Sequence, residues 1–233
     1  MGKDILLRVE DGHLLGAYES GDPVTSSAAI VLLQEIFGVN AHIRSVADEY
    51  AKAGYYVVTP ALFDRVQARV QLDYSPAELE LARGYASRLE PELVLRDIAA
   101  AIAHARARIA SGKVGVVGFC LGGTYAFLSA TRLNPDAAVG YYGGKIVQHA
   151  HEVPLIPTIL HFGSQDRGIS LSDVQAIEHT RPEVPVYIYE AGHAFNRTGG
   201  ANYSEAAASL ARERTLAFLR TTLTEQVPVP IHA

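Results

Sequence analysis

Short apolar runs alternate with segments of helical periodicity along most of this chain. Six runs, rich in β-branched residues, predict buried strands at 28–33, 55–59, 114–117, 137–142, 158–162 and 184–189. Between and after them, apolar positions at helical spacing predict helices at 43–53, 76–87, 92–110, 124–133, 170–180 and 203–223. This alternation is typical of an α/β fold, with a mostly parallel sheet covered by helices on both faces.

The first part of the chain departs from this alternation. Strand-like runs at 5–9 and 14–18 flank Asp11-Gly12, and such a dipeptide predicts a β-hairpin. No internal repeat, linker or low-complexity segment interrupts the pattern that follows. We therefore expect residues 1–233 to form a single α/β domain, a size that can bury a large core.

The stretch 113–124 combines a predicted strand, a sharp turn and a predicted helix. Its sequence Gly118-Phe119-Cys120-Leu121-Gly122 has the G-x-S-x-G pattern of a nucleophile elbow, with a thiol in place of the hydroxyl. The dipole and free N–H groups at the start of the following helix favour a thiolate. Cys120 is thus a candidate nucleophile. The alternative is that it is a small buried apolar residue and that the glycines only serve packing.

Three further chemically active side chains also come directly after predicted strands. They are Glu35, Asp166 and His193, and parallel strands bring their carboxyl ends to one edge of the sheet. The order Cys120, Asp166, His193 is that of nucleophile, acid and histidine in α/β-hydrolases, with the histidine as base and the aspartate orienting it. Alternatively, Asp166 initiates a turn or caps a helix, and His193 is an ordinary loop histidine.

The same motif predicts where a developing oxyanion would be stabilised. One donor is expected to be the backbone N–H of Leu121, directly after the nucleophile. The second is expected from the loop after the first central strand, where Ile36 is the best placed residue.

Composition excludes several classes of protein. The formal net charge of −5 argues against a dedicated nucleic-acid binder, and 48% apolar residues argue against disorder. The charged segment 1–11 does not have the pattern of a secretory signal, and no apolar run is long enough to span a bilayer. The single cysteine allows no intramolecular disulfide and suits a reducing compartment. We therefore expect a cytoplasmic protein with neither nucleic acid nor membrane as partner.

Four segments of the chain, which follow one another in the order found in that family, resemble the dienelactone hydrolases (carboxymethylenebutenolidases). The likeness covers nearly the whole chain and is carried by residues 34–40 (QEIFGVN), 118–123 (GFCLGG), 138–143 (AVGYYG) and 190–198 (EAGHAFNRT). It implies an α/β-hydrolase fold and hydrolysis of the enol lactone dienelactone to maleylacetate through a cysteine acyl-enzyme, a step in (chloro)catechol degradation. It further implies that the enzyme needs no cofactor and no metal.

The resemblance also implies a role for Glu35. In the family, the glutamate of this loop contacts the resting thiol and helps to take its proton when substrate binds. Such a carboxylate would keep the Cys120 thiol protonated until a ligand changes the local charge. The alternative is a structural ion pair between Glu35 and an arginine.

Substrate contacts are implied in the same way. Arg197 matches one arginine of the family's carboxylate-binding group, and Tyr85 matches its tyrosine. Phe37 and Tyr141, from the matching motifs, are expected to contact substrate as well. The family's second arginine is expected one helical turn before the tyrosine, where this chain has Leu81. This difference leaves the particular substrate open.

Two other functions remain possible on the residues alone. The first is a carboxylesterase or thioesterase of the same fold with a different small substrate, and the second is a binding module without catalytic activity. If the protein is an enzyme, we expect it to be a monomer that acts on a small lactone or ester bearing a carboxylate.

Overall fold

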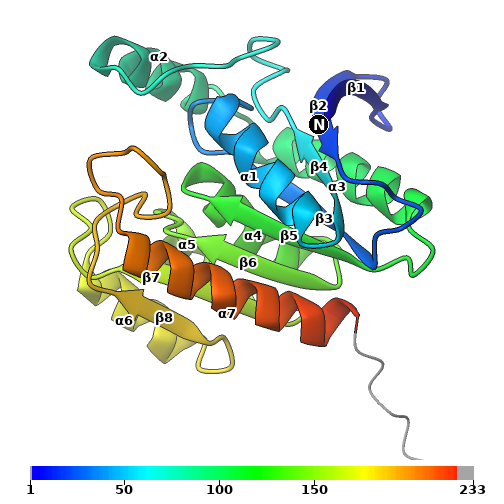
Figure 1. Cartoon of the computed structure of the whole chain (residues 1–233). Coiled ribbons are helices and arrows are strands. Elements are labelled where there is room, and N and C mark those ends of the chain that lie inside the picture. The colour runs from blue at the N-terminus through cyan, green and yellow to red at the C-terminus, as the bar shows by residue number, and fades with distance from the viewer. Residues whose placement is uncertain (1, 225–233) are drawn as a thin grey trace, which may run out of the picture.

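The computed structural model describes residues 2–224, and their strands form one eight-stranded sheet (Figure 1). The strand order is β1-β2-β4-β3-β5-β6-β7-β8. Strands β3 to β8 run parallel, while β1 and β2 form the expected antiparallel hairpin at one edge. The strands span Lys3–Arg8, Leu14–Ser20, Ala28–Leu33, Tyr55–Pro60, Val114–Phe119, Ala137–Tyr141, Thr158–Gly163 and Val186–Tyr189.

Helices cover both faces of the sheet. In chain order α1 to α7 span Ala41–Lys52, Pro76–Ala86, Pro91–Arg108, Leu121–Arg132, Ile146–His149, Leu171–Thr180 and Glu205–Leu223. Helices α1 and α7 pack on one face, and α3 and α4 pack on the other (Figure 1). Across residues 2–224, we find no helix with the length and apolarity that a membrane crossing requires.

The central strands are buried because helices cover both their faces. Every residue of β3, β4, β5, β6 and β7 is buried, which is why their sequences are continuously apolar rather than alternating. The predicted α/β-hydrolase architecture is therefore confirmed. Most element boundaries lie within two residues of the predictions. The largest shift at a helix start is in α4, which begins at Leu121 instead of residue 124, and the short helix α5 was not predicted.

The sequence prediction placed the start of α4 too late because the first turn of this helix contains two glycines. Gly122 and Gly123 are inside this turn, where a Cβ atom would lie 2.4 Å from the carbonyl oxygen of Leu33 and 2.3 Å from that of Tyr141, respectively. Glycine is unfavourable within helices, so these two residues weaken the sequence signal for a helix start. Close approach between helix and sheet requires them, and that contact becomes visible only in the fold.

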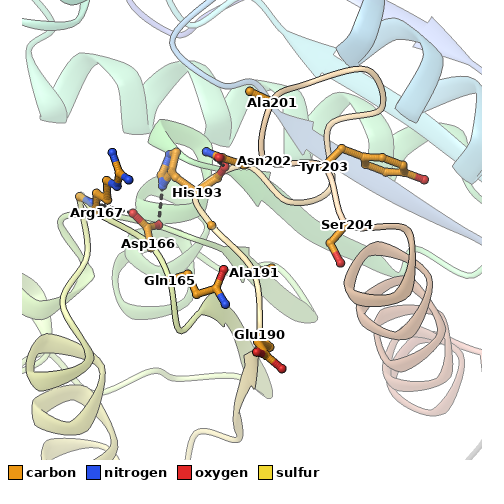
Figure 2. Close-up of a pocket in the computed structure, with 12 residues that line it drawn as sticks. Gln165, Asp166, Arg167, Glu190, Ala191, His193, Ala201, Asn202, Tyr203 and Ser204 are labelled. Carbon is orange, nitrogen blue, oxygen red and sulfur yellow. Dashed lines mark hydrogen bonds and ion pairs between the residues drawn. The ribbon is translucent and has the colours of Figure 1, made fainter.

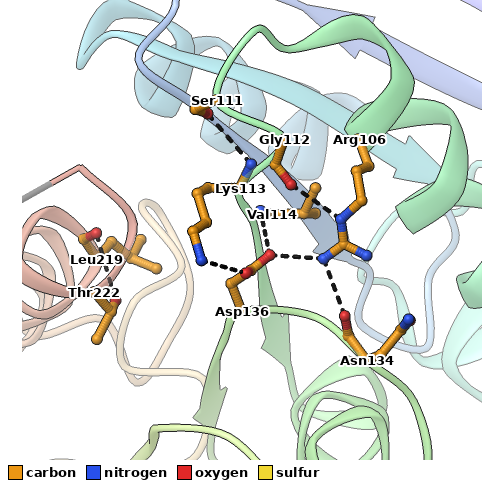
Figure 3. Close-up of polar contacts among 9 residues, drawn as sticks. All are labelled: Arg106, Ser111, Gly112, Lys113, Val114, Asn134, Asp136, Leu219 and Thr222. Carbon is orange, nitrogen blue, oxygen red and sulfur yellow. Dashed lines mark hydrogen bonds and ion pairs between the residues drawn. The ribbon is translucent and has the colours of Figure 1, made fainter. Parts of the chain in front are cut away.

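A polar cluster fixes the opposite, N-terminal end of the central strands. Asp136 accepts hydrogen bonds from the backbone N–H of Val114 at 3.0 Å, from Arg106 Nη2 at 2.6 Å and from Lys113 Nζ at 2.9 Å (Figure 3). The cluster joins the end of α3 to the first residues of β5 and β6. It thereby fixes the first residue of β5, whereas Cys120 follows the other end of the same strand.

Candidate active site

The turn that carries Cys120 has a strained backbone. Cys120 has φ 54° and ψ −110°, a region that residues other than glycine rarely adopt. A Cβ atom at Gly118 would lie 2.0 Å from the carbonyl oxygen of Gly122, so only glycine fits beside the turn. The strain is balanced by hydrogen bonds from Cys120 N to Tyr141 O at 2.9 Å and from Gly122 N to Gln34 O at 3.0 Å. The side chain of Cys120 is half-exposed at the end of β5.

The cysteine, histidine and aspartate predicted from the sequence lie in one row. His193 Nε2 is 3.2 Å from Cys120 Sγ, and His193 Nδ1 is 2.6 Å from Asp166 Oδ2. Figure 2 shows the contact between His193 and Asp166, which follow β8 and β7 respectively. The other oxygen of Asp166 accepts backbone N–H groups of Gly168 at 2.7 Å and of Ile169 at 3.2 Å, so the carboxylate cannot rotate freely.

The charges around His193 favour its protonated form. Burial by itself lowers the pKa of His193, but hydrogen bonds and negative charge from Asp166 and Cys120 outweigh it and raise that pKa to about 10. An imidazolium beside the sulfur stabilises the thiolate. The row can therefore hold an ion pair of thiolate and imidazolium, which can attack a carbonyl carbon and then supply a proton.

The two backbone N–H groups expected to stabilise an oxyanion, of Leu121 and Ile36, stay a prediction. Leu121 is the first residue of α4, so its N–H has no partner within the helix. Within residues 2–224, the N–H of Ile36 makes no backbone hydrogen bond. Both residues are half-exposed.

Glu35 lies in this site, but its partner differs from the one that the family resemblance implies. The residue is 2% exposed, and Tyr74 Oη donates a hydrogen bond to Glu35 Oε2 at 3.2 Å. Burial raises the pKa of Glu35, opposed by the positive charges of Arg197 and His193 and by the hydrogen bond from Tyr74. Among the described residues, the sulfur of Cys120 is hydrogen-bonded to His193 and makes no hydrogen bond with Glu35.

Arg197 approaches the site from the loop after His193. Its Cζ atom lies 3.9 Å from the ring centre of Tyr74, and its charge lowers the pKa of Glu35. Phe37 packs edge-on against the same ring, with centroids 4.4 Å apart. Tyr74 is therefore a site residue that the sequence did not indicate, since it lies in the irregular stretch 62–75 and belongs to no motif.

One expected substrate contact, Tyr141, needs correction. Tyr141 is 1% exposed, and its hydroxyl is bonded to Thr215 Oγ1 at 2.6 Å and to the carbonyl oxygen of Ala211 in α7. Tyr141 thus belongs to the core. The next residue, Tyr142, follows the end of β6 and has its ring centre 5.1 Å from that of His193.

The substrate contact expected of Tyr85 stays a prediction. This residue lies on α2, with its ring 5.9 Å from that of Phe63, and makes no hydrogen bond or ion pair with the site residues described above. Leu81, on the same helix, is 45% exposed. Of the residues expected to bind a carboxylate, Arg197 lies against Tyr74, beside Glu35.

A parallel sheet with helices on both faces, a strained thiol turn after β5 and an acid and a histidine after later strands define an α/β-hydrolase. Comparison with known proteins narrows this class. Residues 16–223 match the model of the dienelactone hydrolase family, and the chain belongs to that family. The protein is thus a hydrolase of the dienelactone hydrolase type.

Individual relatives agree with this assignment. The carboxymethylenebutenolidases of Pseudomonas putida and Pseudomonas knackmussii are each 38% identical to this chain over 223 residues, which cover 92% of this chain and 94% of the relative. Carboxymethylenebutenolidase 1 of Cupriavidus pinatubonensis is 35% identical over 89% of this chain and 92% of its own. A Klebsiella pneumoniae structure described as a candidate dienelactone hydrolase has a TM-score of 0.82 and 25% identity, covering 94% of this chain and 97% of that one.

Proposed function

We propose that this protein hydrolyses dienelactone to maleylacetate, with Cys120 as nucleophile, as a step in (chloro)catechol degradation in the cytoplasm. The observation that carries the proposal is the row from Cys120 Sγ through His193 to Asp166, with contacts of 3.2 and 2.6 Å. The activity named for the relatives at 38% identity supports the choice of substrate.

The reaction follows from this geometry in two steps. The sulfur of Cys120 attacks the lactone carbonyl, the ring C–O bond breaks, and the acyl group stays on sulfur as a thioester. The imidazolium of His193 supplies the proton that the departing enolate takes up. Water then attacks the thioester, with His193 accepting its proton, and the product acid leaves as the thiolate re-forms.

The surrounding groups have defined tasks in this scheme. The N–H groups of Leu121 and Ile36 stabilise the oxyanion formed at the carbonyl. Arg197, whose guanidinium forms no ion pair within residues 2–224, binds the carboxylate of the lactone. Glu35, which is buried near the positive charges of Arg197 and His193, exchanges a proton with the thiol of Cys120 as substrate enters.

The direct test is the loss of dienelactone absorbance with purified protein and with Cys120→Ala. Turnover by the wild type and at least a thousandfold loss in the variant, at unchanged folding by circular dichroism, is the expected result. Residual activity of the variant within tenfold of the wild type would exclude Cys120 as nucleophile. An inert dienelactone would reject the substrate.

One observation favours a second candidate function. Leu81 is exposed where the family resemblance implies an arginine, so recognition of a carboxylate depends on Arg197 without that second arginine. A carboxylesterase or thioesterase acting on a neutral substrate would fit this difference. Faster hydrolysis of p-nitrophenyl butyrate than of dienelactone, measured as kcat/KM, would favour it.

A further inference from the structure

We propose that Tyr74 is the positioning residue of this site: its ring holds the guanidinium of Arg197, and its hydroxyl holds the carboxylate of Glu35. The inference rests on the proposed function, since it concerns how a substrate carboxylate is recognised. It assigns selectivity to a residue of the irregular stretch 62–75, whereas the family resemblance pointed to helix α2.

The first step concerns how Arg197 is held. Its Cζ atom is 3.9 Å from the ring centre of Tyr74, and its side chain forms no hydrogen bond or ion pair with residues 2–224. Stacking uses the flat face of a guanidinium and leaves the N–H groups at its edge free. Tyr74 thus fixes the position of a half-buried cation while keeping its bidentate donors available for a carboxylate.

The second step concerns Glu35. The hydrogen bond from Tyr74 Oη at 3.2 Å is the one that its carboxylate makes within the described part of the chain. A buried carboxylate with a single donor depends on that donor for its orientation. The charges that act on it are the cations Arg197 and His193. Burial raises the pKa of Tyr142, and the negative charges of Glu35 and Cys120 raise it further, so Tyr142 is also near Glu35.

The third step concerns Tyr74 itself, which is held from several directions. Asn40 Nδ2 donates to Tyr74 Oη at 3.2 Å, and the same amide group donates to the carbonyl oxygen of Leu72 at 3.0 Å. Phe37 packs edge-on against its ring. The stretch is further tied to the loop after β3 by a hydrogen bond from Leu72 N to Phe37 O at 2.9 Å and a bridge between Gly38 and Gln71. Such support makes Tyr74 rigid enough to position other groups.

Two substitutions separate the two tasks of Tyr74. Tyr74→Phe removes the hydroxyl and keeps the ring, whereas Tyr74→Leu removes both. The substrates are a matched pair of aryl esters, p-nitrophenyl hydrogen glutarate with a carboxylate and p-nitrophenyl pentanoate without one. Dienelactone is measured beside them.

For Tyr74→Leu we expect KM for the glutarate ester to rise by about tenfold or more, because a displaced guanidinium meets the carboxylate poorly. KM for the pentanoate ester should change less than about threefold, since that ester has no charge to recognise. For Tyr74→Phe we expect little change in KM. Instead, the acidic limb of kcat/KM should move to higher pH. The hydrogen bond from Tyr74 stabilises the ionised carboxylate of Glu35, so its removal raises the pKa of Glu35.

Tyr187 provides the matched control. Tyr187 lies on β8, and the Cζ atom of Arg214 is 4.5 Å from the centre of its ring. Tyr187→Phe and Tyr187→Leu therefore remove the same chemical groups at a different place in the protein. These variants should match the wild type with both esters. Equal losses on both esters in Tyr74→Leu, or an unmoved acidic limb in Tyr74→Phe, would overturn the inference. Inert dienelactone with a selective loss on the glutarate ester would reject the substrate but keep the role of Tyr74.

Discussion

The substitution Asp166→Asn tests the electrostatic design of the site most directly. The side chain of Asp166 is 1% exposed and is held by three partners, the N–H groups of Gly168 and Ile169 on Oδ1 and His193 Nδ1 on Oδ2. In asparagine, the oxygen must face the two backbone donors, which leaves the NH₂ group facing His193. The ring then has to present an unprotonated Nδ1, so its proton moves to Nε2, beside Cys120.

This change removes the base beside the sulfur, because an Nε2 that already carries a hydrogen cannot take the proton of the Cys120 thiol. An aspartate-to-asparagine change that traps this tautomer in a serine protease lowers kcat by about 10⁴. A thiol needs less activation than a hydroxyl, so we expect a loss of about 10² to 10⁴ in kcat/KM. At about 1.36 kcal/mol per tenfold, the loss corresponds to about 3 to 5 kcal/mol of activation free energy.

The pH dependence provides a second readout. Asp166 helps to raise the pKa of His193 to about 10, so its loss lowers that pKa. Less of the thiolate–imidazolium pair should then form at neutral pH than in the wild type. Because Cys120 is the single cysteine of the chain, its rate of alkylation by iodoacetamide reports the thiolate directly, and at neutral pH this rate should be lower in Asp166→Asn.

The control is Asp173→Asn, in the exposed capping box of α6, which should leave both assays unchanged. Activity of Asp166→Asn within threefold of the wild type, with an unaltered alkylation profile, would refute the argument. It would mean that the 2.6 Å contact with His193 does not determine the tautomer.

Three further predictions concern stability, each measured by urea unfolding. Gly118→Ala should cost about 3 kcal/mol or more, because its Cβ would meet a backbone oxygen at 2.0 Å; a change below 1 kcal/mol would contradict this. Asp97→Ala should cost about 1 to 3 kcal/mol, since it removes a fully buried carboxylate 2.7 Å from Arg65, which keeps Asp11 as a partner at 2.8 Å; a neutral effect would exclude a stabilising ion pair. The pKa of Asp136 is lowered, because its partners outweigh burial. Asp136→Asn should therefore cost about 1 to 3 kcal/mol at pH 7, and the difference from wild type should vanish as pH falls below about 3.9, through the folded pKa; a difference independent of pH would contradict it.

Much of the fold was predictable because the signals are local. A strand covered on both faces must be apolar throughout, so runs such as 28–33 are recognisable without knowledge of their neighbours. The thiol turn is equally local at Gly118, since the carbonyl oxygen of Gly122 leaves no room for a side chain there. Chain order and strand ends then indicate Cys120, Asp166 and His193, because parallel strands finish at one edge.

Other parts of the site depended on contacts between distant segments. Tyr74 reaches Glu35 across 39 positions of sequence through an irregular stretch with no periodicity. Two neighbouring tyrosines at the end of β6 are both buried, yet the hydroxyl of Tyr141 is hydrogen-bonded to α7, whereas the ring of Tyr142 lies 5.1 Å from that of His193. The sequence by itself determined the sheet, the thiol turn and the order of the reacting groups, because local sterics and burial encode them. Only the tertiary structure decided which aromatic ring holds Arg197, because that depends on how a loop without a repeating pattern packs against the sheet edge.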